Sequence, residues 1–186
     1  MLPSSLRPLG FNTWEKEEWD EYRSRVPLPD DEAIQEFFRQ VVYDHFDHFN
    51  AHYPDFDIGD YAFHVEHLTA QNAYDDIKFF HNKPLTEWSL QYDEFKSRNQ
   101  DYLIYQRMSV DLTPPFPPIL IQSNLLVDKD WRVYGRDLHL VEGTHRVSYL
   151  RRMLELEEIQ ANSLHKFVVL RPSAEDSSKQ SAFASF

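Results

Sequence analysis

The residues best suited to bind a ligand stand together in one short turn. An alternating apolar segment over 138–141 ends there, and a pattern of helical period begins directly afterwards. Glycine lets a backbone approach a ligand closely, and the first amides of a helix lack internal partners and carry the positive end of its dipole. The turn is therefore predicted to bind phosphate through these amides, a hydroxyl and a guanidinium. Its predicted phosphate- or nucleotide-binding residues are Gly143, Thr144, His145 and Arg146, and the acid before them is Glu142.

A simple strand-to-helix connection explains the same residues without a ligand. In that interpretation Gly143 serves the bend, Thr144 caps the helix, and Arg146 is a solvated first-turn residue. His145 and Arg146, however, are cations at the helix end where the dipole favours anions. Two cations in this place favour the interpretation in which an anion lies between them.

The stretch from about residue 117 to residue 172 resembles the ParB/sulfiredoxin superfamily. The resemblance rests on the order of strand, Glu142–Arg146 turn, amphipathic helix and short strand over 165–170. The turn is most similar to that of the superfamily's free-serine kinases, which reads Asp-Gly-His-Thr-Arg. Sulfiredoxins place their catalytic cysteine where this chain has Thr144, and the chain contains no cysteine, so sulfinic-acid repair by that route is excluded. The arginine-rich turn and the helix-turn-helix domain of CTP-dependent ParB proteins are not found in the sequence either.

The resemblance implies a nucleotide, ATP or ADP, whose phosphates are held at the helix start. The implied activity is phosphoryl transfer or nucleotide hydrolysis, with Mg²⁺ as a possible companion of the nucleotide. Glu142 is the candidate catalytic residue, as a base or metal-binding acid, unless it bonds back to the amides of its own turn. The alternative is a non-catalytic binding protein of the immunity or antitoxin type, whose acidic surface blocks a basic partner. Whether the chain is an enzyme therefore stays open.

Composition limits the classes of partner. The chain has 186 residues, a formal net charge of −12, no cysteine, and 15% aromatic residues. The negative charge argues against a nucleic-acid partner, which needs a positive surface, and suits a basic protein partner. No segment has the roughly 18 consecutive apolar residues of a membrane span. The sequence predicts an ordered, cytoplasmic protein without a membrane partner.

Three histidines have a spacing that would suit a metal site, but other features of the sequence argue against one. His45, His48 and His52 recur at spacings of three and four, so they share one helix face. That face continues the apolar stripe of the same predicted helix, and no His-Glu-x-x-His pattern is present. We therefore expect the three side chains to end a buried seam and to hold no metal.

The pattern of elements predicts an α+β protein. Its helical N-terminal half is expected to pack on a small ParB/sulfiredoxin-like mixed sheet, with one main helix after the turn. The predicted parts are a mainly helical 1–100, a sheet-containing 101–172, and a disordered tail over 173–186. Helices are predicted over 14–22 (capped by Asn12 or Thr13), 33–52, 85–95 and 144–158. Strands are predicted over 102–105, 119–121, 131–133, 138–141 and 165–170. For residues 61–73 the pattern fits either a strand or a helix. On the main helix, Arg151 and Glu155 are expected to pair.

Overall fold

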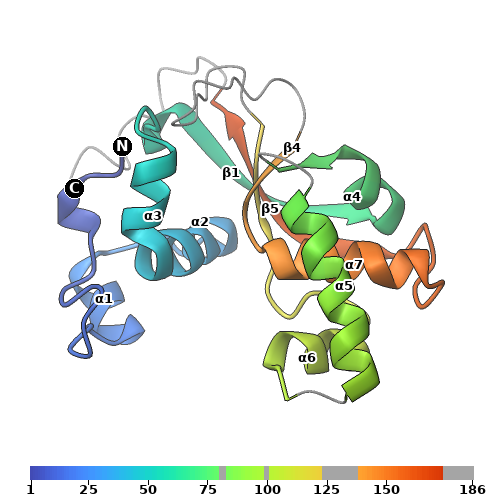
Figure 1. The fold of residues 1–186 in the computed structure, drawn as a ribbon. Helices are drawn as coiled ribbons and strands as arrows, with labels where there is room; N and C mark the ends of the chain where they lie inside the picture. Colours follow the sequence, from blue (N-terminus) through green and yellow to red (C-terminus); the bar gives the residue numbers. More distant parts are fainter. Residues whose placement is uncertain (80–82, 99–100, 123–137, 174–186) are drawn as a thin grey trace. The chain divides into compact units, whose positions relative to one another are not determined.

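The computed structural model describes residues 1–79, 83–98, 101–122 and 138–173. Within these residues the chain forms helices and one five-stranded mixed sheet, which confirms the predicted α+β class (Figure 1). The strand predicted over 131–133 lies outside the described residues, and so do residues 174–186 of the tail predicted to be disordered.

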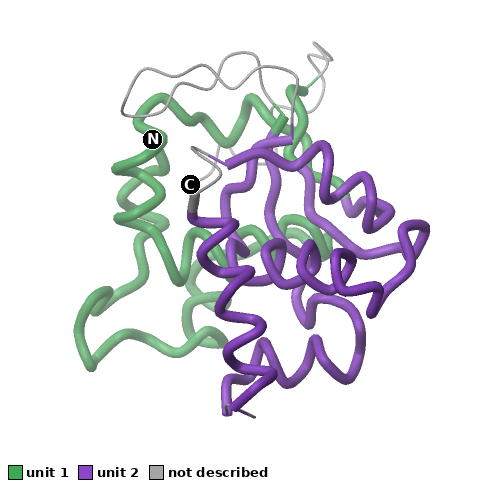
Figure 2. The backbone as a smooth tube through the Cα atoms, turned by 45° about the vertical axis from the view of Figure 1, so that its right-hand side comes forward, with its two compact units in different colours: residues 1–64, 122–136, 170–186 green, residues 65–121, 137–169 purple. Residues whose placement is uncertain are grey.

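The chain divides into two compact units that do not follow the order of the sequence (Figure 2). The first unit comprises residues 1–64, 122–136 and 170–186, of which the structure describes 1–64, 122 and 170–173. The second unit comprises residues 65–121 and 137–169 and contains the Glu142–Arg146 turn. Everything that bears on the candidate site therefore belongs to the second unit.

The first unit is mainly helical and has an aromatic core. Its elements are η1 (Ser4–Leu6), α1 (Trp19–Arg25), α2 (Glu32–Phe37), the π-helix η2 (Phe38–Tyr43), α3 (Asp44–His52) and η3 (Ile58–Asp60). The ring of Phe37 is fully buried and contacts those of Phe49, Phe56 and Phe63 at centroid distances of 5.9, 6.0 and 5.2 Å. Such ring pairs add to the free energy gained from burial alone.

The first helix begins later than predicted. Residues 10–13 form a turn instead, in which the Thr13 hydroxyl donates to the Gly10 carbonyl and Asn12 has a φ of 66°. α1 starts at Trp19 because Glu18 and Glu21 form a reciprocal capping box. The cap residue is Glu18, and neither Asn12 nor Thr13 caps this helix.

The predicted helix over 33–52 forms, but not as one regular helix. Its start is confirmed, because the Asp31 carboxylate accepts from the Ile34 amide. The π-helix at 38–43 then interrupts it, and His45 leaves helical geometry at φ −133° and ψ 26°. A π segment shifts the phase of the side chains, so the predicted apolar stripe and the histidines after it do not lie on one regular helix. The kink at His45 also interrupts the spacing that links His45 to His48 and His52.

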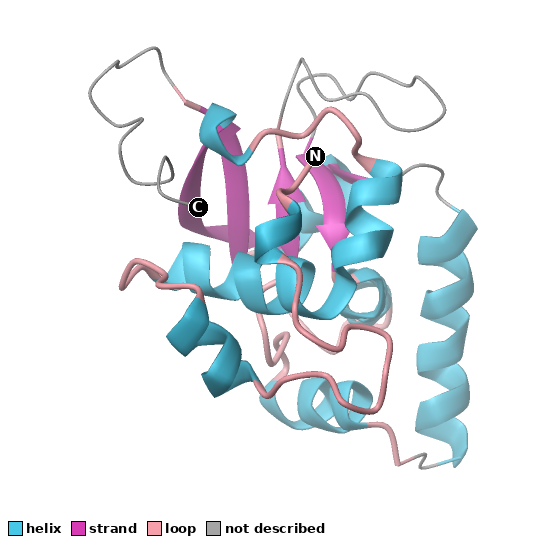
Figure 3. Cartoon of the chain, turned by 90° about the vertical axis from the view of Figure 1, so that its left-hand side faces the viewer, coloured by secondary structure: helices cyan, strands magenta, loops and turns pink. Residues whose placement is uncertain are grey.

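The sheet has the strand order β1-β5-β3-β4-β2. Figure 3 draws its strands in magenta. The strands are β1 (Tyr61–Thr69), β2 (Ile77–Lys78), β3 (Ile119–Ile121), β4 (Leu138–Glu142) and β5 (Leu164–Pro172). β2 runs parallel to β4, and β3 runs antiparallel to it with Leu120 opposite Leu140. The strands predicted over 119–121, 138–141 and 165–170 are thereby confirmed, and the undecided stretch 61–73 is strand β1 followed by helix.

Four helices accompany the sheet among the described residues of the second unit. They are α4 (Ala70–Asp76), α5 (Lys83–Arg98), α6 (Leu103–Asp111) and α7 (Thr144–Glu155). The strand predicted over 102–105 is wrong, since this stretch opens α6. Tyr105 and Met108 are three residues apart on that helix and both are buried, and the Tyr105 ring meets that of Tyr92 at 5.4 Å. Tertiary packing of this face outweighs the β-propensity of the Tyr-Leu-Ile-Tyr run.

Helix α7 forms the centre of the second unit. Its residues Val147, Leu150 and Met153 are at most 1% exposed and belong to one apolar cluster with residues of the sheet, against which the partly buried Leu154 packs. Across α7 lies α5, whose Ser89 hydroxyl approaches the Ser148 carbonyl and whose Asp93 pairs with Arg152. The described helices include none that is long and apolar enough to cross a membrane.

Candidate functional site

The Glu142–Arg146 turn joins the end of β4 to the start of α7. Helix α7 begins at Thr144, as the change of sequence period predicts, and Gly143 is its N-cap residue. Gly143 has φ 105° and ψ 32°, a left-handed conformation that is costly for residues with a β-carbon. Its carbonyl accepts the first helical hydrogen bond, from the Val147 amide at 3.0 Å.

No side chain caps the start of α7. At α2 and α4, by contrast, the side chains of Asp31 and Thr69 accept a hydrogen bond from a first-turn amide. Thr144 does not cap α7, because it is the first residue inside the helix. The ligand-free interpretation, in which Thr144 caps the helix, is wrong on this point. The first amides of α7 thus keep the donor capacity that a capping oxygen would use.

Arg146 is buried, contrary to the interpretation that makes it a solvated first-turn residue. Its side chain is 6% exposed, and Nη1 donates to the Phe116 carbonyl at 3.1 Å and lies 3.5 Å from the Pro117 carbonyl. Nη2 donates to Glu142 Oε1 at 3.3 Å. The guanidinium therefore ties the helix start to the proline segment before β3, and these carbonyls and Glu142 already use part of its donor capacity.

Gly143 also has a steric reason to be glycine. A β-carbon built at this position would lie 3.0 Å from Arg146 Nη2 and 3.0 Å from Pro118 Cβ. The close approach of the turn to Pro118 and the buried guanidinium therefore depends on the missing side chain. This is the use of glycine that the sequence predicts, although the nearest partners belong to the protein and not to a ligand.

Glu142 lies at an irregular point of the sheet. In the antiparallel pairing it stands opposite Ile119, and the register shifts between Ile119 and Leu120. Such bulges redirect side chains at strand ends. The Glu142 side chain is 31% exposed, so one carboxylate reaches both the Arg146 guanidinium and solvent at the turn.

His145 lies among aromatic rings. Its imidazole centroid is 3.8 Å from the ring of Trp88 on α5, 5.7 Å from that of Tyr102 and 6.0 Å from that of Tyr149. Burial lowers the pKa of His145 below its usual 6.5, which outweighs the opposing effect of the Glu142 charge. The imidazole is therefore neutral at pH 7, and the argument from two cations at one helix start loses its first cation. Trp88 is half-buried and lies far from His145 in the sequence, where no local pattern connects the two residues.

His45, His48 and His52 all belong to α3, with His45 near its start and His52 at its end. The rings of His48 and His52 are 4.2 Å apart, and His52 Nδ1 lies 2.9 Å from the His48 carbonyl oxygen. His45 sits at the kink. Within the residues that the structure describes, no group of three or more histidine, aspartate or glutamate side chains is arranged to hold a metal ion.

Replacing Gly143 with alanine is expected to destabilise the protein by about 1–3 kcal/mol, the cost of a strained left-handed residue. Urea unfolding followed by circular dichroism measures the effect. Gly59→Ala is the matched control, because Gly59 has no positive φ and an added β-carbon would meet only Asp57 Oδ1 at 3.3 Å. The control should change the free energy of unfolding by no more than about 0.5 kcal/mol. Equal effects of the two substitutions would contradict the role given to Gly143.

Stability is expected to fall as the pH drops below about 6.5, because burial lowers the pKa of folded His145 while the unfolded chain titrates at the ordinary value. The stabilising contribution is complete above the unfolded pKa and is lost toward the lower folded pKa. His145→Phe keeps a ring in the aromatic surroundings and should flatten this dependence. Burial shifts the pKa of His165 in the same direction, so part of the slope should remain. Histidine resonances followed by NMR give the pKa directly, and a value for His145 above 6.5 would refute the prediction.

Comparison with known proteins yields no relative. No protein-family model, no curated protein and no solved structure matches the chain. The resemblance of the Glu142–Arg146 turn to the ParB/sulfiredoxin superfamily accordingly stays a prediction, and the functional argument rests on the geometry of the turn.

Proposed function

We propose that the Glu142–Arg146 turn binds the phosphates of a nucleotide such as ATP or ADP. The observation that carries the proposal is the uncapped start of α7 directly behind the left-handed Gly143. Helix starts of this kind bind phosphate through their amides and the positive end of the helix dipole. Thr144 is only partly buried at the first helical position and adds a hydroxyl donor.

The side chains of the turn take different parts in this proposal. Arg146 acts as a positioning residue, because its bonds to the Phe116 carbonyl and Glu142 keep the helix start beside the proline segment. His145 is neutral and forms part of the aromatic wall with Trp88. Phosphate recognition then rests on the backbone amides and Thr144, and the guanidinium contributes its positive charge at short range without direct bidentate contact.

The proposed reaction is phosphoryl transfer or nucleotide hydrolysis, with Glu142 accepting the proton of the attacking hydroxyl or water. Mg²⁺ in such sites is held by one or two carboxylates together with the phosphates of the substrate. Glu142 fits this donor set as a partly exposed carboxylate beside the phosphate amides. When bound, the metal ion would neutralise phosphate charge.

Adding a negative charge at position 144 should weaken nucleotide binding without harming the fold. In Thr144→Glu the carboxylate repels phosphate, while an acid in the first turn suits the helix dipole. Charges about 4 Å apart near a protein surface interact by roughly 4 kcal/mol, so affinity for ADP should fall at least about tenfold. Thr144→Gln is the matched neutral control and should bind within about threefold of the original protein, since the amides are retained. Calorimetry with ADP and Mg²⁺ measures both, and equal loss in the two variants would contradict binding at the turn.

Glu142→Gln is expected to separate chemistry from binding. The amide keeps an oxygen that accepts from Arg146 but cannot take up a proton, so turnover should drop by about 10²–10⁴-fold while ADP affinity is retained. Release of phosphate from ATP, or its transfer to an added acceptor, measures turnover. Glu94→Gln removes an exposed carboxylate that pairs with Arg98 on α5 and serves as the control. Undiminished turnover in Glu142→Gln would exclude Glu142 as the base.

A non-catalytic binding protein is the second candidate, and the contacts of Arg146 and His145 favour it. In this turn Arg146 bonds to carbonyls and to Glu142, and His145 is neutral. The cationic side chains of the turn thus serve the fold and do not contact phosphate directly. The formal charge of −12 then suits an acidic surface that blocks a basic protein. Absence of heat with ATP, ADP, CTP and GTP, together with absence of turnover, would decide for this candidate over the nucleotide site.

A further inference from the structure

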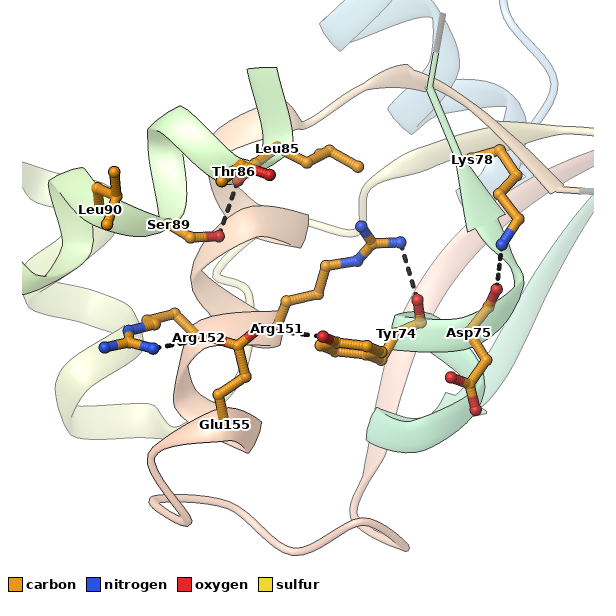
Figure 4. A pocket seen from close by; sticks show the side chains of 10 residues that line it. All are labelled: Tyr74, Asp75, Lys78, Leu85, Thr86, Ser89, Leu90, Arg151, Arg152 and Glu155. Atoms are coloured by element: carbon orange, nitrogen blue, oxygen red, sulfur yellow. Dashed lines mark hydrogen bonds and ion pairs between the residues drawn. The ribbon is translucent and has the colours of Figure 1, made fainter. Parts of the chain in front are cut away.

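A second site lies on α7, away from its start. A pocket of about 410 Å³ is lined by residues of α4, β2, α5 and α7, all of them in the second unit (Figure 4). Its lining includes Tyr74, Lys78, Ser89 and Arg151. Arg151 lies seven residues beyond Thr144, which at 1.5 Å per residue is about 10 Å along the helix. The volume is in the range of small-molecule sites, which is about 300–1,000 Å³.

Arg151 enters this pocket without a carboxylate partner. Both of its hydrogen bonds to described residues start at Nη2, to the Tyr74 carbonyl at 2.9 Å and to the Ile77 carbonyl at 2.6 Å. Its Nε is buried and has no hydrogen-bond partner. The expected pair with Glu155 does not form, because Arg151 turns toward the connection between α4 and β2 (Figure 4). Its hydrogen bonds go to two carbonyls, and its Cζ lies 5.4 Å from the centre of the Tyr74 ring. Burial lowers the pKa of the Arg151 guanidinium, although the charges of Glu155 and Asp75 act in the opposite direction.

Several other arginines of the described chain form ion pairs with acids. Ion pairs at 2.5 to 3.3 Å link carboxylates to Arg7, Arg25, Arg98, Arg146 and Arg152. Arg152, the neighbour of Arg151, is held by Asp93 from α5 and by Glu155. A cation that is partly removed from water gains most from a counter-charge. An anion would therefore gain more free energy from binding to Arg151 than to the ion-paired Arg146 or Arg152.

The acids that line the pocket are already engaged. Glu155 accepts from the Tyr74 hydroxyl at 3.1 Å and from Arg152 Nη1 at 2.9 Å. The Asp75 side chain accepts from Gln71 at 2.8 Å. Lys78 is a second cation in the pocket lining. Its ammonium bonds to the Asp75 carbonyl, and the side chain is otherwise exposed. An ammonium has three donors, so Lys78 keeps donor capacity for a ligand.

We infer that this pocket binds a small organic oxyanion, with Arg151 and Lys78 as the residues that attract its carboxylate or phosphate group. Arg151 supplies the Nη1 donor and a charge that no ion pair with a described carboxylate neutralises, and Lys78 supplies a second charge at the rim. Ser89 donates to the Leu85 carbonyl at 2.7 Å, so its oxygen is left to accept from a hydroxyl or amide of the ligand. Leu85 and Leu90 give the pocket an apolar side for the ligand's carbon skeleton.

Titration with two simple probes, inorganic phosphate and acetate, at constant ionic strength tests the inference. Two-dimensional ¹H–¹⁵N NMR follows the Arg151 Nε–H signal and the Lys78 amide. At least one of the two probes should shift both signals until they saturate. The probe that binds more tightly shows whether the pocket prefers a phosphate or a carboxylate group. The amides of Thr144 and His145 report separately on the turn at the start of α7. Failure of the pocket and failure of the proposed nucleotide site are therefore distinguishable.

Charge-matched variants decide whether the pocket is specific. Lys78→Gln removes an exposed side chain, leaves the fold intact, and should weaken the preferred probe about tenfold, the scale of one charge-assisted hydrogen bond. Arg151→Met should abolish saturation at the Lys78 amide. Arg98→Gln removes one positive charge on α5 outside the pocket and should leave the affinity unchanged. Absence of saturable shifts with both probes, or equal weakening in Lys78→Gln and Arg98→Gln, would overturn the inference.

Discussion

The left-handed conformation of Gly143 is the constraint on which the second unit depends. It turns the chain from β4 into α7 within one residue, and α7 in turn contributes buried side chains to the core of that unit. The turn is tight enough that Pro118 and the Arg146 guanidinium occupy the space where a β-carbon would stand. One backbone conformation thereby links the sheet, the proline segment and the helix. The same geometry leaves the α7 amides uncapped, so the structural constraint and the proposed phosphate site have a single cause.

The three arginines of α7 bond to three different parts of the second unit. Arg146 bonds to carbonyls of the proline segment, Arg152 bonds to Asp93 on α5, and Arg151 bonds to carbonyls at the end of α4. Each guanidinium thus ties α7 to a different element. Arginine suits this task because its planar group presents five donors in fixed directions. Since Arg146 and Arg152 also have carboxylate partners, Arg151 is the member of the trio with charge left for a ligand.

The first unit is stabilised by different means. Its core consists largely of packed aromatic rings around Phe37, and its helices are linked by polar contacts such as the bidentate pair of Arg7 with Asp47. The Arg25 guanidinium reaches Glu17 and the Arg7 carbonyl, which connects α1 to the N-terminal segment. Aromatic side chains bury a large area each, and this explains how a chain with four glycines and no disulfide builds an ordered core from short, irregular helices.

The sequence by itself determined the strands β3, β4 and β5, the helices α5 and α7, and the place of the Gly143 turn. In each case a local pattern suffices, because hydrophobic period and the conformational freedom of glycine act over a few residues. Tertiary structure decided the rest. α6 is a helix because Tyr105 and Met108 are buried together, and His145 is neutral because Trp88 from another helix covers it. The sequence places Arg146 in the turn and predicts that Arg151 pairs with Glu155. Their actual partners come from segments distant in the chain, at Phe116 and Tyr74, so only the folded protein shows that Arg146 is buried and that Arg151 lines a pocket.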